Sequence, residues 1–339
     1  MSQSAAPISV IVAEDFSDAI LQELRAVSPR LQVERHFPAV PERAWLDAEV
    51  LYTIRTFPTP EQAPRLRWIQ LHMAGVEEAL KAPVIKAQDI EVTNASGIHS
   101  VPMAEYCLMM MLAFNYRLPT MIEAKERIEW PADLEAVYNP APLRGQTVGI
   151  IGYGSVGREV ARLATGAGMT VLAAKRDVMH PEQPDKYIEP GTGDPTGDLP
   201  DRIYPMQAAV SLVKECDFVV LACPLTRLTR HLIDEEVLAA MKRTAVLINV
   251  ARGAVVDEAA LISALAAGRI AGAALDVFEE EPLPATSPLW NLPNAILSPH
   301  ASGNRVDYNQ QCANLFAANL RRYLEHEPLL NRVSREREY

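Results

Sequence analysis

The sequence is poor in cysteine and has no apolar run long enough to span a membrane. It has four cysteines in 339 residues, Cys107, Cys216, Cys223 and Cys312, and no two of them form a CxxC pair. Scattered cysteines disfavour a disulfide framework or a zinc site and fit a reducing compartment, so we expect a cytoplasmic protein without a metal. The apolar stretch YCLMMMLAF at 106–114 is too short to cross a bilayer and indicates a buried helix. The N-terminus lacks a basic segment ahead of an apolar core, so no signal peptide is expected.

Clustered basic charge is also missing. The chain has 32 lysines and arginines against 43 aspartates and glutamates, which gives a net charge of −11. Nucleic acid is therefore disfavoured as a partner, because phosphate backbones need grouped basic side chains. Small anions are not excluded, since local geometry can hold them. The composition, 49% hydrophobic and 22% charged, is typical of a globular protein, and the length suggests two domains.

The first third of the chain alternates strand-like and helix-like segments. A helical pattern covers 17–27, and a longer one runs from about 101 to 128, ending near Trp130-Pro131 because proline stops a helix. Strands alternating with helices favour a parallel sheet with both faces covered. The short apolar runs that predict strands are 8–14, 50–54, 67–71 and 90–94.

A second alternation begins at residue 147. Its runs lack polar alternation, as expected for parallel strands buried on both faces. Six strands separated by helices predict a doubly wound dinucleotide-binding fold. The six runs are 147–152, 170–175, 217–223, 245–250, 272–277 and 294–300.

Residues 178–207 interrupt this second alternation. The segment is rich in Pro, Gly and Asp and has no apolar period, which predicts a long surface loop. It is either a solvated insertion or a lid near the adenosine end of a cofactor site. The sequence leaves both readings open.

A glycine-rich turn opens the second alternation. Gly152, Gly154 and Gly157 form G-x-G-x-x-G between a strand and a helix, the context in which this motif binds a dinucleotide. The first glycine permits the tight turn, the second lets backbone approach a pyrophosphate, and the third allows close helix–strand packing. We expect the amides of the first helical turn, including Ser155 and Val156, to face the phosphates.

The end of the next strand predicts which dinucleotide is used. A carboxylate there would bind the ribose 2′-hydroxyl of NAD, but this strand ends in Lys175 and Arg176. Two charge-assisted contacts to a 2′-phosphate, each contributing about 1–2 kcal/mol, would favour NADP by roughly one to three decades. We expect a preference for NADP(H), while Asp177 leaves room for NAD(H). Alternatively, the two cations are solvated charges at the start of a loop.

Three polar residues follow later strands of the same series. Arg252 follows the strand LINV, Glu281 lies in DVFEEEPLP, and His300 ends ILSPH. Open α/β sheets bind ligands at the carboxyl ends of their strands, so these side chains are candidates for a catalytic site.

At these residues the chain resembles the D-isomer-specific 2-hydroxyacid dehydrogenase family. The blocks GYGSVG, LACPLTRLTRHLID, LINVARGAVVDEAAL, GAALDVFEEEPLP and LSPHASG are similar to those of the family and occur in the same order. The resemblance covers nearly the whole chain. It implies that Arg252, Glu281 and His300 are the catalytic residues.

The three residue types suit the reduction of a 2-keto acid. A histidine can protonate the carbonyl oxygen while hydride reaches the carbon. A carboxylate beside it favours the imidazolium and fixes the ring. An arginine can hold the substrate carboxylate and polarise the carbonyl. We therefore expect His300 as the acid/base, Glu281 as its partner and Arg252 as the substrate clamp.

The resemblance implies further contacts. On the substrate side it implicates the backbone amides of Ala74, Gly75 and Val76 and, in some members, an arginine at the place of Arg55. His99 either reaches the cleft or is a loop histidine with partners of its own. Residues expected at the cofactor, beside the glycine turn, are Cys223, Pro224, Thr229, Val250, Ala251, Arg252, Asp276, His300, Ser302 and Gly303. Among them, Asp276 is expected to meet the nicotinamide carboxamide.

The resemblance also implies an architecture of two doubly wound parallel-sheet domains with a cleft between them. A flavodoxin-like substrate domain would comprise 1–100 and 303–339, and a Rossmann-type dinucleotide domain 101–302. The last helix, about 307–327, would return to the first domain on a face containing Cys312, Leu315, Phe316, Ala318, Leu320 and Tyr323. The helix 101–116 and the arm to residue 139 resemble the dimer interface of the family, so we expect a homodimer.

The expected function is reduction of a small 2-keto acid such as glyoxylate or hydroxypyruvate by NADP(H). Oxidation of phosphoglycerate or phosphite is an alternative within the superfamily, whereas Glu281 argues against the formate-oxidising type, which carries Gln there. A dinucleotide-sensing protein like the transcriptional corepressors of the superfamily is an alternative of another class. The acidic balance of the chain disfavours it.

Overall fold

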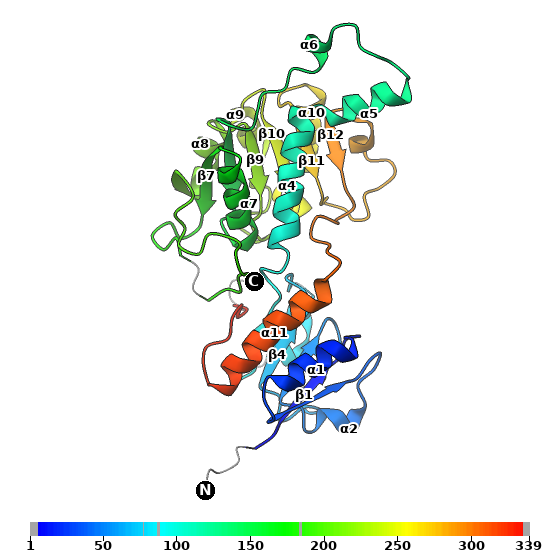
Figure 1. Ribbon diagram of the computed structural model, residues 1–339, viewed down its shortest axis with the longest axis vertical. Helices are drawn as coiled ribbons and strands as arrows, with labels where there is room; N and C mark the ends of the chain where they lie inside the picture. Colours follow the sequence, from blue (N-terminus) through cyan, green and yellow to red (C-terminus); the bar gives the residue numbers. More distant parts are fainter. Residues whose placement is uncertain (1–5, 77, 87–88, 183–184, 335–339) are drawn as a thin grey trace. The chain divides into compact units, whose positions relative to one another are not determined.

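The computed structural model describes residues 6–76, 78–86, 89–182 and 185–334, and these form two compact units (Figure 1). The described residues up to 98, 185–187 and those from 305 onward make the first unit, and 99–182 and 188–304 make the second. Each unit contains one parallel sheet, so the predicted fold class is confirmed. Residues 185–187 count with the first unit although they lie within the range 101–302.

The sheet of the first unit has the order β2-β1-β3-β4-β5, and all its strands are parallel. The order reverses between β1 and β3, as in flavodoxin-like folds. Four of the strands were predicted, and β2 was not, because this edge strand buries only two of its five residues. The strands are β1 (Ile8–Val12), β2 (Leu31–Arg35), β3 (Val50–Thr53), β4 (Trp68–Leu71) and β5 (Glu91–Thr93).

Helices cover both faces of this sheet. One core forms under α1 (Asp18–Ala26) and α11 (Tyr308–Leu324), the other under α2 (Glu42–Trp45), η1 (Ala79–Lys81) and α3 (Pro83–Lys86). The ring of Phe316 on α11 lies 4.9 Å from that of Tyr52 and 5.3 Å from that of Trp68, between centroids. Of the predicted face of α11, four residues are buried and two are half-buried, Ala318 and Tyr323.

The second unit contains a seven-stranded parallel sheet of order β12-β11-β10-β9-β6-β7-β8. Six of its strands were predicted. The seventh, β8, lies inside 178–207, so the prediction of a loop throughout that segment is wrong at its end. This strand pairs only with β7, and a short edge strand ending in proline gives a weak sequence signal. The strands are β6 (Thr147–Ile151), β7 (Thr170–Lys175), β8 (Arg202–Pro205), β9 (Phe218–Leu221), β10 (Val246–Asn249), β11 (Gly272–Leu275) and β12 (Ala295–Leu297).

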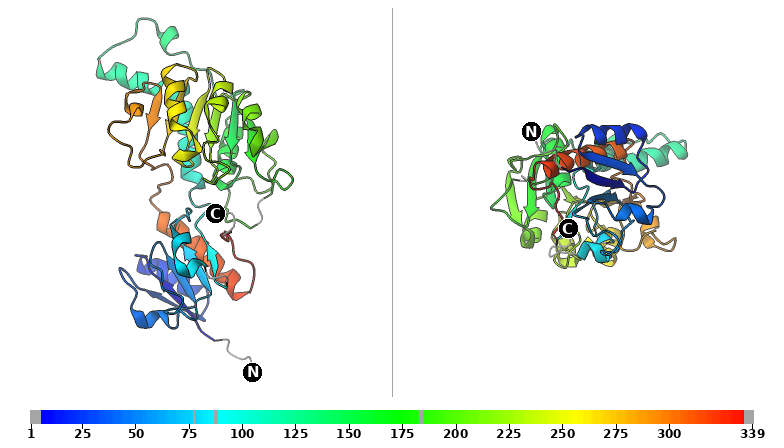
Figure 2. Two further views of the ribbon diagram at one scale, coloured as in Figure 1. Left: turned by 180° about the vertical axis from the view of Figure 1, so that it is seen from behind. Right: turned by 90° about the horizontal axis from the view of Figure 1, so that it is seen from below.

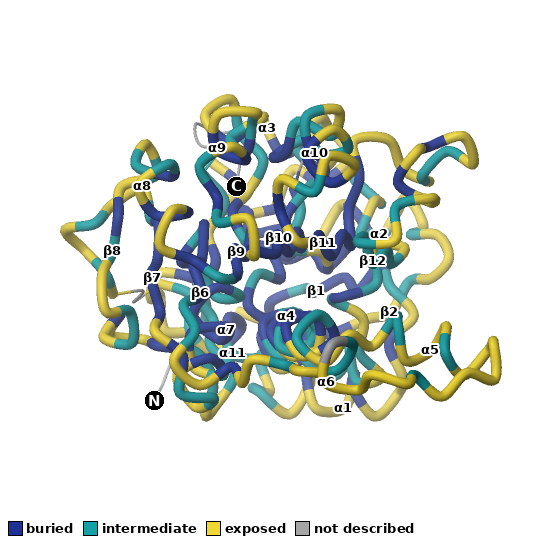
Figure 3. Tube along the Cα trace, turned by 90° about the horizontal axis from the view of Figure 1, so that it is seen from above, coloured by how far each residue is buried: buried dark blue, intermediate teal, exposed yellow. Residues whose placement is uncertain are grey.

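Helices again cover both faces of the sheet. On one face lie α4 (Ser100–Asn115) and α7 (Ser155–Gly166), and on the other α8 (Ala209–Val213), α9 (Glu235–Ala240) and α10 (Glu258–Ala266) (Figures 1 and 2). All residues of β9, β10 and β11 are buried, as expected for strands covered twice (Figure 3). Short 3₁₀ helices occur at η2 (Met206–Ala208), η3 (Gly253–Val255) and η4 (Pro288–Asn291).

The apolar run 106–114 lies in α4, where it contributes Cys107, Met110 and Met111 to the core. The run is therefore a helix, as predicted, but it is only partly buried, because Met109 and Leu112 are exposed. In the described part of the chain, every helix is too short or too polar to cross a bilayer.

The single helix predicted from 101 to 128 is two helices. It breaks at Tyr116 and Arg117, where Arg117 adopts a left-handed φ of 50°, and α5 (Leu118–Glu126) follows. Pro119 explains the break, because proline is accepted only in the first turn of a helix. Further along the arm lies α6 (Leu134–Val137), and α5 buries none of its residues.

Candidate active site

The three candidate catalytic residues follow three neighbouring strands. Arg252 follows β10, Glu281 follows β11 and His300 follows β12, and these strands are adjacent in the sheet. Because the strands are parallel, their carboxyl ends share one edge. The topology therefore brings the three loops to the same edge of the second unit.

Glu281 and His300 form a direct pair. Nδ1 of His300 lies 2.7 Å from Oε2 of Glu281, and Oε1 of Glu281 accepts the backbone N–H of Phe278 at 3.0 Å. An ionised carboxylate can only accept, so Nδ1 carries the donated hydrogen and Nε2 is left to exchange a proton with a ligand. The imidazole is half exposed and the carboxylate about one-third exposed, so a small molecule can reach the pair.

The backbone of His300 is held in an unusual conformation. Its φ is 52°, a left-handed value that few non-glycine residues adopt, and its N–H donates to Asp276 O at 2.8 Å. The buried carboxylate of Asp276 accepts the N–H of Ala301 at 2.8 Å and that of Ser302 at 2.9 Å. Asp276 thus fixes the loop that carries the histidine, and strain of this kind is typical of functional sites.

Two residues that help to hold Asp276, Ser298 and Tyr106, were missed by the sequence analysis. The Ser298 hydroxyl lies 2.6 Å from Oδ1 of Asp276, and the Tyr106 hydroxyl lies 2.7 Å from that of Ser298. Burial raises the pKa of Tyr106 to about 12, so the phenol stays neutral. Tyr106 comes from α4, far away in sequence, and no local pattern marks it.

The loop of Arg252 packs directly on the loop of Glu281. A Cβ on Gly253 would lie 1.8 Å from the carbonyl carbon of Phe278, so only glycine fits there. Nη1 of Arg252 donates to Ala251 O at 2.8 Å, and its own carbonyl accepts from Asn249 Nδ2 at 3.2 Å. The guanidinium is therefore carried on a loop whose backbone is fixed from both sides.

The glycine turn has the geometry of a phosphate site. Gly152 has a φ of 106°, and a Cβ there would lie 2.5 Å from Cys223 N, so no other residue fits. A Cβ on Gly157 would lie 2.2 Å from Gly152 O, which shows how closely α7 approaches the turn. A Cβ on Gly154 would instead meet nothing within 4 Å, which leaves open space at the amino end of α7. The residues therefore fit a dinucleotide pyrophosphate at this helix terminus.

Other residues expected at the cofactor surround this turn. Cys223 is buried behind Gly152, and burial raises the pKa of its thiol to about 12, so it stays a thiol. Thr229 bonds within its own loop, donating to Pro224 O at 2.7 Å. Val250 and Ala251, after β10, are buried. The described residues contain no group of three His, Cys, Asp or Glu side chains that could hold a metal.

Lys175 and Arg176 have different surroundings. Lys175 ends β7, and its Nζ donates to the carbonyls of His180 and Pro181, the latter at 3.0 Å. Burial lowers its pKa, and the positive charge of Arg158 contributes. Arg176 is exposed. The Asp177 carboxylate lies 2.9 Å from Nδ1 of His180, so this carboxylate faces the loop that follows β7.

The segment 188–199 is anchored on the glycine turn by a buried polar network. The Tyr153 hydroxyl donates to Oδ2 of Asp194 at 2.5 Å, and the guanidinium of Arg158 donates to Asp194 O and lies over the Tyr153 ring. Glu159 on α7 accepts the N–H of Gly193 at 2.6 Å. Burial opposes ionisation of Asp194, but hydrogen bonds from the Tyr153 hydroxyl and from the N–H groups of Leu199 and Asp198 keep its pKa below the usual range. The segment 188–199 is therefore not a solvated insertion. In the sequence, only Asp194, which lies between Gly193 and Gly197, indicated such a network.

The expected substrate-side residues lie in the first unit. Arg55 is exposed just after β3, and Ala74, Gly75 and Val76 follow the neighbouring strand β4. They thus share the carboxyl edge of the first sheet. His99 precedes α4, and its Nδ1 lies 3.0 Å from Gly303 O, which favours its reading as a loop histidine.

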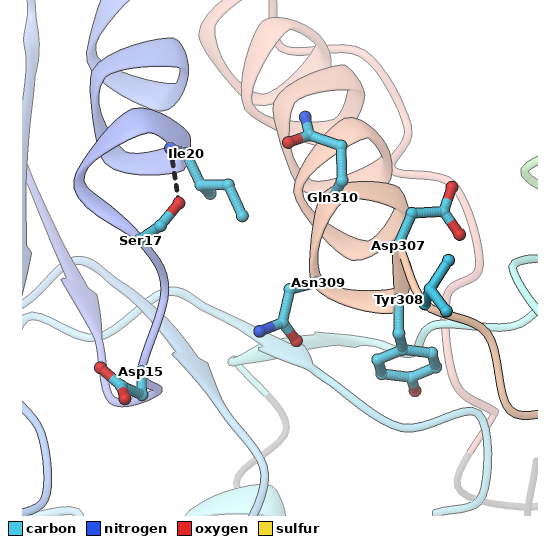
Figure 4. Close-up of a pocket in the computed structure, with 8 residues that line it drawn as sticks. Asp15, Ser17, Ile20, Asp307, Tyr308, Asn309 and Gln310 are labelled. Atoms are coloured by element: carbon cyan, nitrogen blue, oxygen red, sulfur yellow. Dashed lines mark hydrogen bonds between the residues drawn. The ribbon is translucent and has the colours of Figure 1, made fainter.

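A hollow of about 590 Å³ lies in the first unit between the amino ends of α1 and α11 (Figure 4). Its lining includes Asp15, Ser17, Asp307, Tyr308 and Asn309, and Ser17 caps α1 through Ile20 N (Figure 4). Two carboxylates disfavour an anionic ligand there. None of the expected catalytic, cofactor or substrate residues lines it.

The comparisons agree with this geometry. The sequence profile of the D-isomer specific 2-hydroxyacid dehydrogenase, NAD binding domain, matches residues 108–302. A glyoxylate reductase of Korarchaeum cryptofilum is 34% identical over 306 residues, covering 86% of this chain and 84% of that protein. A glyoxylate reductase of Thermococcus gammatolerans is 38% identical over 269 residues, covering 77% of this chain and 74% of that protein.

A solved structure agrees as well. It is a D-isomer specific 2-hydroxyacid dehydrogenase from Xanthobacter autotrophicus Py2 in complex with NADPH and MES, with a TM-score of 0.78. It is 29% identical and covers 99% of this chain and 100% of that chain. The fold, the glycine turn and the carboxylate–imidazole pair thus define a nicotinamide-dependent oxidoreductase. The chain belongs to the D-isomer specific 2-hydroxyacid dehydrogenase family.

Proposed function

We propose that the chain reduces a small 2-keto acid, such as glyoxylate or hydroxypyruvate, to the D-2-hydroxy acid with NADP(H) as the preferred cofactor. The observation that carries this proposal is the 2.7 Å contact between Glu281 and His300, at an edge shared with Arg252. The names of the glyoxylate reductases to which the chain is similar support the size of the substrate.

In this reaction His300 supplies the proton. The nicotinamide, when bound at the glycine turn, supplies hydride to the carbonyl carbon. The imidazolium transfers a proton from Nε2 to the carbonyl oxygen, and Glu281 stabilises its positive charge before the transfer. In the oxidation direction the neutral imidazole accepts the hydroxyl proton at the same nitrogen. The partly exposed pair exchanges its proton with solvent between turnovers.

Arg252 and the first unit share the binding of the substrate. Arg252 holds the substrate carboxylate and stabilises the negative charge that develops on the carbonyl oxygen. The amides of Ala74, Gly75 and Val76 bind the same carboxylate from the first unit, with Arg55 as a further cation. We assign 1–100 and 303–339 to substrate binding and 101–302 to cofactor binding.

The proposed cofactor contacts follow from the same arrangement. The first turn of α7 binds the pyrophosphate, and Lys175 and Arg176 provide the positive charge for a 2′-phosphate. Cys223, Pro224 and Thr229 line the dinucleotide from the loop that follows β9, and Val250, Ala251, Ser302 and Gly303 line it from the next loops. The carboxamide of the nicotinamide is assigned to Asp276, whose carboxylate also organises the loop of His300. A 29% identical structure with NADPH supports the choice of cofactor.

The most direct test is a panel of 2-keto acids assayed with NADPH and with NADH in parallel. We expect reduction of glyoxylate and hydroxypyruvate, with kcat/KM for NADPH at least about tenfold above that for NADH. Phosphite and 3-phosphoglycerate, offered with NADP⁺, serve as the alternative substrates. Turnover of either of these alone would replace the proposed substrate class. Binding of NADPH without turnover of any compound would favour the sensing alternative.

We also propose a homodimer that forms through α4, α5 and the arm to residue 139. Several large apolar side chains along α4, α5 and the arm are exposed, and exposed apolar side chains that gather on one surface mark an interaction site. They are Met109, Leu112, Tyr116, Leu118, Met121, Ile122, Ile128, Trp130 and Leu134. A stable dimer buries about 800 Å² or more on each partner, and residues of this kind can supply that area.

The dimer proposal predicts a change of mass in solution. Light scattering should give twice the 37.3 kDa of the chain for the wild type. The double variant Met121→Glu, Ile122→Glu should give a monomer, because it places charge in the apolar contact. The matched change Leu228→Glu, at an exposed leucine outside the arm, should leave the dimer intact. A monomeric wild type would contradict the proposal.

We place the enzyme in the cytoplasm. All four cysteines are free and buried, and no pair of them forms a disulfide. Reduced, unpaired thiols are typical of cytosolic enzymes, which supports this location.

A further inference from the structure

The segment 72–76, after β4, has its carbonyl groups tied back to the first unit. His72 O accepts the Tyr308 hydroxyl at 2.9 Å, Met73 O accepts Ala95 N at 3.0 Å, and Ala74 O accepts Asn94 Nδ2 at 2.8 Å. Three consecutive carbonyls are therefore each held by a different group. These hydrogen bonds fix the orientation of the peptide groups in the segment.

The amides of the same segment are placed differently. Among the residues that the structure describes, the N–H groups of Met73, Ala74, Gly75 and Val76 donate to no protein acceptor. Consecutive N–H groups without a protein acceptor form a concave anion site when they point the same way.

The planarity of the peptide bond sets the direction in which these N–H groups point. Within one peptide unit the C=O of a residue and the N–H of the next residue point in opposite directions. Holding Met73 O toward Ala95 therefore turns the N–H of Ala74 outward. Holding Ala74 O toward Asn94 turns the N–H of Gly75 outward in the same way.

We propose that Asn94 is a positioning residue that aims the Gly75 N–H at the carboxylate of the substrate. The inference rests on the proposed role of this segment in binding a 2-keto acid. Ala95 performs the same task for the N–H of Ala74, but through its backbone, so side-chain substitution cannot test it. Among the residues that the structure describes, Asn94 is the side chain that holds the carbonyl preceding an expected substrate amide, and it does so through a single hydrogen bond.

The amide group of Asn94 can adopt only one orientation. Its Oδ1 accepts Ser96 N at 3.1 Å, so its Nδ2 has to face Ala74 O. The residue is 4% exposed. Its backbone N–H donates to Asn331 O, and its carbonyl accepts from Asn331 Nδ2, each at 3.2 Å. Both the side chain and the backbone of Asn94 are therefore held by hydrogen bonds, which fixes the Nδ2 group that donates to Ala74 O.

Asn331 extends this support to the segment 185–187. It is fully buried near the C-terminus, its Oδ1 accepts Tyr187 N at 3.0 Å, and its N–H donates to Asp185 O at 3.0 Å. Residues 185–187, which lie within the predicted loop 178–207, therefore belong to the first unit and bond to the residue that holds Asn94.

The test is Asn94→Asp, which keeps size and shape. The carboxylate still accepts Ser96 N, but it places an oxygen against Ala74 O, so the hydrogen bond becomes a repulsion. Losing one well-aimed bond to a charged group should raise KM for glyoxylate by about 10- to 100-fold. The inhibition constant of oxamate, a carboxylate analogue, should rise by the same factor. Since the lost bond is equally present in the ground and transition states, kcat should stay within about threefold, and Kd for NADPH should not change.

Two further variants separate positioning from stability. Asn94→Ser keeps an acceptor for Ser96 N but is too short to reach Ala74 O, and it should raise KM in the same way. Asn319→Asp is the matched control, because Asn319 is fully buried in the same unit and bonds to Leu330 O and Gln70 Oε1, not to 72–76. It should lower Tm while leaving KM and the oxamate constant unchanged.

Each outcome of these experiments supports or overturns the positioning role of Asn94. A wild-type KM in both Asn94 variants overturns the positioning role, and so does a KM that rises equally in Asn319→Asp. Failure of both Asn94 variants to fold, when Asn319→Asp folds, shows that the residue is structural and also overturns the proposal. A wild type that reduces no 2-keto acid instead overturns the proposed function, and the carboxylate role of the segment with it.

Discussion

Replacing His300 with alanine should lower kcat for glyoxylate or hydroxypyruvate reduction by a factor of about 10³ or more. General acid catalysis by a positioned side chain contributes about 10²–10⁴ in rate, and His300 is the titratable group that Glu281 orients at this edge. Kd for NADPH should change by less than about threefold, because the glycine turn and α7 are untouched. Steady-state absorbance of NADPH gives kcat, and quenching of protein fluorescence gives Kd.

Glu281→Gln should lower kcat by less than His300→Ala does. Glutamine can still accept the Nδ1 hydrogen but carries no charge, so it holds the ring without favouring the imidazolium. We expect a loss in kcat of about 10- to 100-fold, smaller than that of His300→Ala. If His300→Ala retained more than about a tenth of the wild-type kcat, another group would have to supply the proton.

Replacing Arg176 with aspartate should reverse the preference between the two cofactors. The substitution removes a charge-assisted contact to the 2′-phosphate and adds a carboxylate that repels it and can bind a ribose 2′-hydroxyl. We expect kcat/KM for NADPH to fall by about 10²- to 10³-fold. The value for NADH should change little or rise. Parallel kinetics with both cofactors measure the ratio.

Lys175→Met tests whether the two cations are equivalent. The Lys175 ammonium already donates to the carbonyls of His180 and Pro181, so a 2′-phosphate would compete for it. We therefore expect a smaller loss with NADPH than in Arg176→Asp, together with a lower Tm. Equal efficiency of the wild type with NADH and NADPH would contradict the proposed preference.

The placement of Arg252, Glu281 and His300 at one edge of the sheet could be predicted because it depends on a period and a topology. Buried parallel strands give uninterrupted apolar runs, and the residue that follows each run lies at one edge of the sheet. Arg252, Glu281 and His300 all follow such runs, in β10, β11 and β12. The glycine turn was visible for a similar reason, since Gly152 and Gly157 stand where a Cβ would strike backbone.

The predicted secondary structure was wrong where a single residue interrupts the apolar period or where a strand is short and lies at a sheet edge. The apolar period runs on from α4 into α5, but Pro119 and the left-handed Arg117 divide the helix. The edge strands β2 and β8 are short and half polar, so their signal is weak. A proline in a periodic segment interrupts the helix even where the apolar period continues.

The support of the site could not be predicted, because it joins residues far apart in the chain. Tyr106 reaches Ser298, Tyr153 reaches Asp194, and Asn94 reaches Ala74, each through one hydrogen bond. Such contacts leave no period in the sequence, and each residue type is common on protein surfaces. These side chains become buried and paired only in the folded structure.

Isotope transfer tests the central claim most directly. In the proposed reaction the carbonyl carbon receives hydride from the nicotinamide on one face while His300 protonates the oxygen. Hydroxypyruvate reduced with NADPH that carries deuterium at both C4 positions should give D-glycerate with a single deuterium at C2 and no L-isomer, as chiral chromatography with mass spectrometry would show. A product without deuterium, or a mixture of both enantiomers, would contradict the account.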